Sequence, residues 1–131
     1  METAVESAIK TILLIDDDSE EHELFSEALK RYNSNITCLT AFNCWKGYEL
    51  AQQKKPDVIF VDMNLPGSDG LACLRKIKKT KDLKDVSVYI YSGGAVTNKD
   101  ILTALEEGAK KWIKKPGGPE DYDKMFATQI N

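Results

Sequence analysis

Five strand-like runs recur along the 131-residue chain, and the first and third are apolar enough to be typical of strands buried on both faces of a sheet. These runs cover residues 11–16, 36–42, 57–62, 86–92 and 111–115. A segment with apolar residues at helical spacing follows each run. These segments cover residues 19–32, 44–55, 69–79, 98–108 and 119–130. Such strict alternation predicts an α/β fold in which helices cover both faces of a parallel sheet.

The predicted helix starts carry capping signals. Asp18 followed by Glu21 resembles a capping box in which Asp takes the place of Ser or Thr. Ser68 or Asp69 is expected to cap the third helix. His22, the only histidine, lies in the charged start of the first helix and is expected to be a solvated surface residue.

The composition indicates the class of protein and excludes several partners. Hydrophobic residues make up 42% of the chain and charged residues 30%, as in a globular domain. A formal net charge of -3 gives no case for nucleic acid or an anionic membrane as a partner. No apolar run approaches the roughly 20 residues of a membrane span, and the acidic start lacks the apolar core of an export signal. We therefore expect a cytoplasmic protein with a flexible leader at 1–9 and one domain at 10–131.

The cysteines and the histidine offer little chemistry of their own. Cys38, Cys44 and Cys73 occur without a C-x-x-C motif, and their odd number predicts free thiols in a reducing compartment. We expect them to pack as small apolar residues. With one histidine, the chain has almost no material for a histidine-based metal site or a Ser-His-Asp triad.

Polar residues stand at the carboxyl ends of four predicted strands. The first strand ends in Asp16–Asp18, the third in Asp62, the fourth in Ser92 and the fifth in Lys114–Lys115. Open parallel sheets bind ligands at the rim formed by the carboxyl ends of their strands, so we expect these groups to lie close together there. Clustered carboxylates repel one another unless a cation lies between them. Oxygen ligands favour Mg²⁺ (or Mn²⁺) over zinc or copper.

A metal ion, a lysine, a hydroxyl and several carboxylates together suit phosphoryl transfer. The cations neutralise charge on the moving phosphoryl group, and one carboxylate can form an acyl phosphate. The alternative for an aspartate at a strand end is a helix cap, which we expect of Asp18 and Asp69. Capping alone does not account for polar groups at four strand ends. Because neighbours on a strand point to opposite faces, only one of Lys114 and Lys115 can enter the site.

Four motifs resemble those of the receiver domain of two-component response regulators, over about residues 10–130. The motif "LLIDDDS" resembles the acidic pair at the end of the first strand, and "DMNLPGSDG" resembles the phosphoacceptor loop. The motif "YSGG" resembles the Ser/Thr that precedes a small residue, and "GAKKWIKKP" resembles the Lys-Pro ending. The resemblance implies a three-layer, doubly wound, flavodoxin-like (βα)5 fold with strand order 2-1-3-4-5.

The resemblance also implies a role for each chemical group at the rim. Asp62 would be the phosphoacceptor and a metal ligand. Asp17 would bind the metal directly and Asp16 through water, while Asn64 would offer its backbone carbonyl. Lys115, immediately before the proline, would pair with the acceptor carboxylate and the phosphoryl group.

Further positions match the parts of the family that switch and shape the site. Ser92 would hydrogen-bond a phosphoryl oxygen, and Trp112 matches the switch aromatic, which is more often Tyr or Phe. The loops around the site would be shaped by Pro66, Gly70, Gly93 and Pro116. Gly93 stands where alanine is frequent, and Gly94 after it makes this loop looser.

The implied function is a signalling receiver rather than an enzyme that acts on other substrates. A histidine kinase or a histidine phosphotransfer protein would supply the phosphoryl group, and output would pass through protein contacts without a DNA-binding domain. Three rival hypotheses stay open. The first is a receiver-like binding module that never turns over phosphate. The second is a haloacid-dehalogenase-type phosphohydrolase with Asp16 as nucleophile, and the third is a flavodoxin-like electron carrier.

Overall fold

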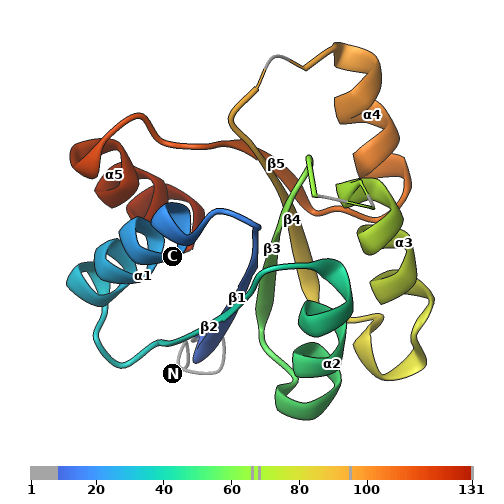
Figure 1. The fold of residues 1–131 in the computed structure, drawn as a ribbon, viewed down its shortest axis with the longest axis horizontal. Helices are drawn as coiled ribbons and strands as arrows, with labels where there is room; N and C mark the ends of the chain where they lie inside the picture. The colour runs from blue at the N-terminus through green and yellow to red at the C-terminus, as the bar shows by residue number, and fades with distance from the viewer. Residues whose placement is uncertain (1–8, 66, 68, 95, 131) are drawn as a thin grey trace, which may run out of the picture.

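A parallel five-stranded sheet in the order β2-β1-β3-β4-β5 forms the centre of the protein in a computed structural model (Figure 1). The strands are β1 (Thr11–Ile15), β2 (Thr37–Ala41), β3 (Val58–Asp62), β4 (Ser87–Ser92) and β5 (Lys111–Lys114). The structure describes residues 9–65, 67, 69–94 and 96–130. Strand order reverses direction between β1 and β3, as in doubly wound folds that bind ligands at this point. The predicted fold class and strand order are confirmed.

Helices cover the sheet on both sides. The helices are α1 (Ser19–Tyr32), α2 (Cys44–Lys54), α3 (Gly70–Lys79), α4 (Asn98–Glu106) and α5 (Pro119–Gln129), with a short 3₁₀ turn at Lys81–Leu83. Helices α1 and α5 lie on one face, and α2, α3 and α4 lie on the other (Figure 1). In the described part of the chain, no helix is both long enough and apolar enough to cross a membrane.

Side-chain caps start most of the helices. Asp18 accepts a hydrogen bond from the backbone amide of Glu20, and Asp69 accepts one from that of Ala72. The capping box predicted for Asp18 and Glu21 is wrong, because the Glu21 carboxylate turns into the protein instead of back to the cap. A capping box forms at α4, from Thr97 and Asp100.

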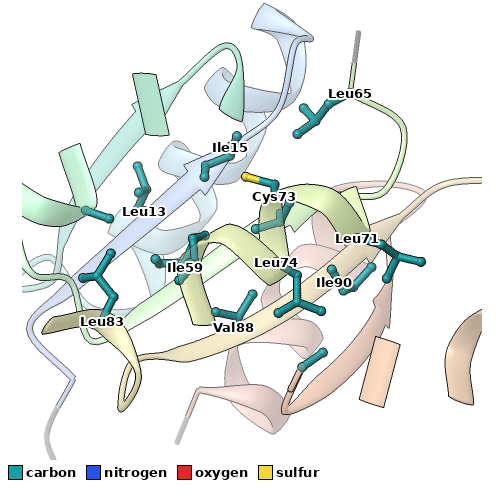
Figure 2. Packing of buried hydrophobic residues seen from close by; sticks show 14 of the residues in the cluster. Leu13, Ile15, Ile59, Leu65, Leu71, Cys73, Leu74, Leu83, Val88 and Ile90 are labelled. Carbon is teal, nitrogen blue, oxygen red and sulfur yellow. The ribbon is translucent and has the colours of Figure 1, made fainter. Parts of the chain in front are cut away.

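Alternate residues of each strand point into two separate cores. The aliphatic cluster lies under α2, α3 and α4 (Figure 2). It contains Leu13, Ile15, Ala41, Ala51, Ile59, Val61, Leu65, Leu71, Cys73, Leu74, Ile77, Leu83, Val88, Ile90, Ala104 and Ala109. The aromatic cluster lies under α1 and α5. It contains Ile12, Leu14, Phe25, Ala28, Leu29, Val58, Phe60, Tyr89, Tyr91, Ile113, Tyr122, Met125, Phe126 and Ile130. A rigid sheet packed on both faces thus holds the residues at its carboxyl rim.

Candidate functional site

Four polar residues meet at the carboxyl rim of the sheet. Asp16 follows β1, Asp62 and Ser92 are the last residues of β3 and β4, and Lys115 follows β5. Relative exposure is 0% for Asp16, 5% for Asp62 and 1% for Ser92. Buried carboxylates are uncommon without partners, so these side chains indicate a site rather than a solvated edge.

The Lys115 ammonium group bridges the two buried carboxylates. Its Nζ lies 2.8 Å from Oδ2 of Asp16 and 3.5 Å from Oδ2 of Asp62. Lys114 is exposed, so the lysine that reaches the carboxylates is the one next to the proline. Gly93 packs against the lysine stem, since a Cβ atom there would lie 3.3 Å from Cδ of Lys115. The residue after strand β5 therefore places one ammonium group, that of Lys115, at the rim.

Burial and charge act against each other in this group. Burial raises the pKa of Asp16 more than the Lys115 ammonium group lowers it, and the nearby Asp62 charge adds to the rise. Burial alone would lower the pKa of Lys115, but the Asp16 and Asp62 carboxylates outweigh it and raise that pKa above its usual value. One lysine thus faces two carboxylates, so a further cation would offset the remaining negative charge.

The arrangement of oxygens fits a divalent metal ion. Asp16, Asp17 and Asp62 each offer one carboxylate oxygen, and these atoms all lie within 4.8 Å of one another. Oδ2 of Asp16 is buried and has no hydrogen bond of good geometry, although the Lys115 ammonium group lies close to it. A hard cation that prefers oxygen ligands would satisfy this atom.

Backbone amides orient the two buried carboxylates. Oδ1 of Asp16 accepts from the amide of Asp18 at 3.0 Å, and Oδ1 of Asp62 accepts from the amide of Asn64 at 3.1 Å. Each aspartate is thereby held with its other oxygen toward the lysine. The role implied for the Asn64 carbonyl stays a prediction, because the described contact of Asn64 is made by its amide.

Glycine at position 70 allows α3 to start directly against the end of β3. A Cβ atom there would lie 2.6 Å from the carbonyl oxygen of Asp62 and 2.7 Å from Cα of Met63. The Gly70 amide donates to the Met63 carbonyl at 2.8 Å. Any larger residue would displace the backbone that carries Asp62. Pro66, which was also expected to shape this loop, lies outside the described residues, whereas Pro116 lies half-buried after Lys115.

The two expected switch residues lie on neighbouring strands. Oγ of Ser92 accepts a hydrogen bond from the Gly94 amide at 3.4 Å, and the Ser92 carbonyl accepts one from the Lys115 amide at 2.9 Å. Trp112 is half-buried and packs against the aliphatic cluster. Their switching roles stay predictions, since a single conformation is described.

Two residues beneath the rim were missed by the sequence analysis. The prediction that His22 is solvated is wrong. The residue is 8% exposed, and its ring stacks on Phe42, with Nε2 2.6 Å from the Asp16 carbonyl oxygen. Glu21 is also 8% exposed. Both could have been found from spacing, because Glu21 lies four residues before Phe25 and His22 three before it, on the buried stripe of α1.

The expectation of three free thiols is also wrong. Cys44, at the start of α2, and Cys73, in α3, form a disulfide with a Cα–Cα distance of 5.7 Å. Cys38 is the free cysteine among the described residues. The two partners are 29 residues apart in sequence and lack a short motif, so only the packing of α2 against α3 brings them together.

The fold and the rim define a doubly wound domain with an acidic, lysine-containing site at its topological switch point. Residues 12–127 match the response regulator receiver domain family. The chain therefore belongs to this family, whose members are mainly signalling modules, and the resemblance in the motifs is confirmed.

Individual relatives agree with this assignment. Protein PilH of Pseudomonas aeruginosa is 32% identical over 109 residues, which cover 80% of this chain and 84% of PilH. The nitrate/nitrite response regulator protein NarL of Escherichia coli is 35% identical over 120 residues, 88% of this chain and 52% of NarL. The chain spans about half the length of several curated relatives that it matches, such as the 48% of PhoB of P. aeruginosa.

Solved structures share the same fold. The Mn²⁺-bound form of response regulator Rcp1 superposes with a TM-score of 0.81 at 22% identity, covering 93% of this chain and 95% of that one. The chemotaxis protein CheY4 of Vibrio cholerae gives a TM-score of 0.80 at 22% identity, with 92% and 98% covered. At this identity the likeness concerns the fold alone.

Proposed function

We propose that this chain is a phosphoacceptor receiver that takes a phosphoryl group from a phosphohistidine onto Asp62 in a Mg²⁺-dependent reaction. The observation that supports this most is the Lys115 ammonium group between the buried carboxylates of Asp16 and Asp62. Receiver domains are phosphorylated by histidine kinases or histidine phosphotransfer proteins, and either is the proposed partner here.

In the proposed reaction, an Asp62 carboxylate oxygen attacks phosphorus in line with the leaving histidine nitrogen. The new O–P bond forms as the P–N bond breaks, which leaves an aspartyl phosphate and a neutral imidazole after proton uptake. Lys115 offsets negative charge on the transferred phosphoryl oxygens, and the Ser92 hydroxyl donates to one of them. The Asn64 amide keeps the Asp62 side chain in the orientation that attack requires.

Three groups are proposed to hold the metal ion. They are Asp17 and Asp62 through carboxylate oxygens and the Asn64 carbonyl, with Asp16 acting through water. When bound, Mg²⁺ would neutralise charge on the phosphoryl group, and Mn²⁺ could take its place. Receiver domains bind Mg²⁺ through an acidic pocket, and the three clustered aspartates here supply the corresponding oxygens.

The signal is proposed to leave through protein contacts. Phosphorylation would draw Ser92 toward the phosphoryl group and bias the conformation around Trp112 and α4. A switch of this kind needs contacts that differ by a few kcal/mol between its two states.

The test is incubation with acetyl phosphate and Mg²⁺, followed by intact-mass measurement. Wild type is expected to gain one phosphoryl group, and EDTA is expected to prevent the gain. Asp62→Asn should gain none. Asp82→Asn, which changes an exposed carboxylate outside the rim, is the matched control and should behave as wild type. A wild type that gains nothing contradicts the proposal and favours a binding module without phosphoryl turnover. An Asp62→Asn variant that gains as much as wild type also contradicts it, because the acceptor is then another residue.

A further inference from the structure

A buried glutamate joins three elements directly beneath the rim. Glu21, in the first turn of α1, is 8% exposed. Its Oε2 accepts a hydrogen bond from the hydroxyl of Tyr91 on β4 at 2.7 Å and another from that of Tyr122 on α5 at 2.7 Å. Two short bonds to one oxygen make this carboxylate a fixed anchor, because hydrogen bonds to charged acceptors are the strong ones.

Tyr91 connects this anchor to the site. It precedes Ser92 in β4 and lies opposite Asp62 in the pairing of β3 with β4. The Lys115 ammonium group lies 5.5 Å from the centroid of the Tyr91 ring, within the range of a cation–π contact. The ring of Tyr91 therefore contacts the site lysine, and its hydroxyl donates a hydrogen bond to Glu21.

The protonation of the two phenols keeps the anchor intact. Burial, and then the Glu21 carboxylate, raises the pKa of Tyr91 and of Tyr122 well above the usual value. Both phenols therefore stay hydrogen-bond donors at any physiological pH. The Glu21 charge also contributes, after Asp16 and Asp62, to the raised pKa of Lys115.

We propose that Glu21 is a positioning residue for Lys115, which it serves by fixing the Tyr91 ring under the ammonium group and by adding a third negative charge beneath it. This role rests on the proposed phosphoacceptor function, because it concerns the lysine that would stabilise the transferred phosphoryl group. Glu21 does not touch the reacting atoms. Its contribution is to hold the lysine where the phosphoryl oxygens arrive, so that less of its freedom is lost during transfer.

The same strand contains a matched control. Tyr89, two residues before Tyr91 and on the same face, lies under the Lys111 ammonium group at 5.2 Å. Its hydroxyl donates a hydrogen bond to the Gln129 carbonyl oxygen at 3.5 Å and not to a carboxylate. Tyr89→Phe and Tyr91→Phe therefore remove the same hydroxyl from a similar place, but only the second is connected to Glu21 and Lys115.

The kinetic experiment compares wild type with Glu21→Gln, Tyr91→Phe and Tyr89→Phe. Phosphorylation by acetyl phosphate is followed by intact mass at saturating Mg²⁺ and phosphodonor. We expect Glu21→Gln and Tyr91→Phe to lower the maximal rate about threefold to tenfold, with the half-saturating Mg²⁺ concentration changed by less than about twofold. Tyr89→Phe should keep the wild-type rate.

A second readout reports the position of Lys115 without phosphorylation. Protons above an aromatic ring are shifted upfield, so the Lys115 side-chain methylenes should be displaced in the ¹³C–¹H spectrum of wild type. This displacement should shrink in Glu21→Gln and Tyr91→Phe and stay in Tyr89→Phe, with Lys115→Met used for assignment. An unchanged displacement in Glu21→Gln overturns the positioning role, whatever happens to the rate or to the unfolding midpoint.

The two readouts separate the two hypotheses. A smaller displacement with a slower rate supports the role of Glu21. A wild-type rate in Glu21→Gln overturns that role while the phosphoacceptor function stands. If wild type gains no phosphoryl group, the proposed function fails, and the ring-shift comparison alone then decides whether Glu21 positions Lys115.

Discussion

The two faces of the sheet are packed by different chemistry. Under α1 and α5, the aromatic cluster stacks its rings edge to face, with Phe60 5.0 Å from Phe25, 5.1 Å from Tyr89 and 5.4 Å from Tyr91. Under α2, α3 and α4, the aliphatic cluster is built mainly from branched side chains (Figure 2). The disulfide between Cys44 and Cys73 ties α2 to α3 on this face. The sheet thus separates a ring-packed core from a covalently tied one.

The difference shows how each face can influence the rim. Tyrosine rings carry hydroxyls that need hydrogen-bond partners when buried. On the aromatic face, the Tyr91 hydroxyl bonds to Glu21, and the Tyr91 ring lies under the Lys115 ammonium group. Branched aliphatic side chains have no such ends. The aliphatic face therefore acts on the site through shape, by holding α3 and the loop that follows Asp62.

The largest expected effect concerns the covalent tie on the aliphatic face. The Cys44–Cys73 bond closes a loop of 29 residues, so reduction with dithiothreitol should lower the free energy of unfolding by about 3.5 kcal/mol. Urea unfolding with and without reductant measures the loss. Cys44→Ser should be insensitive to the reductant. Equal unfolding of wild type in both conditions would contradict the tie.

The next effect concerns ring packing on the aromatic face. Phe60→Leu removes three ring contacts at about 0.5–1.5 kcal/mol each, so a total loss of about 1.5–4.5 kcal/mol is expected, with about 3 kcal/mol at the middle of this range. Its neighbour Ile59 points to the aliphatic face, where Ile59→Leu keeps the volume and should cost less than about 1.5 kcal/mol. Urea unfolding of both variants measures the difference. Equal losses would remove the distinction between the two cores.

A smaller effect tests how tightly α2 sits on the aliphatic face. A methyl group at Gly47 would overlap the Ile15 side chain. Gly47→Ala should cost about 1–2 kcal/mol of unfolding free energy, because overpacking outweighs the better helix propensity of alanine. Adding Ile15→Val should recover part of the loss. Gly94→Ala has open space around it and serves as the control. An unchanged free energy of unfolding in Gly47→Ala would contradict tight packing of α2 against Ile15.

The smallest effect concerns the free thiol beside the aromatic cluster. Burial raises the pKa of Cys38 from 9.0 to about 11. Between these values the unfolded chain loses the thiol proton first, so the contribution of Cys38 to stability falls as the pH rises through this window. Alkylation by iodoacetamide should be slow at pH 8.5 and should rise toward pH 11. A rate at pH 8.5 equal to that of a free cysteine in a peptide would contradict this burial.

The fold could be predicted because each strand carries its own signal. The run from Val58 to Val61 is apolar because both faces of β3 are covered, and it ends in the Asp62 carboxylate at the rim of the sheet. One helix bound differs from its prediction: the sequence pattern extends the fourth helix to Gly108, whereas α4 ends at Glu106 and Gly108 takes a left-handed conformation with φ 113°.

The rim could be predicted only in part. Asp16, Asp62 and Lys115 stand at strand ends, so a one-dimensional pattern was enough to bring them together. Glu21 depends on residues at distant positions, because Tyr91 and Tyr122 reach it from β4 and α5. A glutamate in a first helical turn is usually a capping or solvated residue, and only its tertiary partners show otherwise.

The most direct test of the account locates the phosphoryl group on the chain. After treatment with acetyl phosphate and Mg²⁺, borohydride converts an aspartyl phosphate to homoserine, and peptide mass spectrometry identifies the modified residue. The account predicts homoserine at position 62, absent when EDTA is added. Homoserine at position 16 or 17 instead, or at no aspartate, would contradict the assignment of Asp62 as the acceptor.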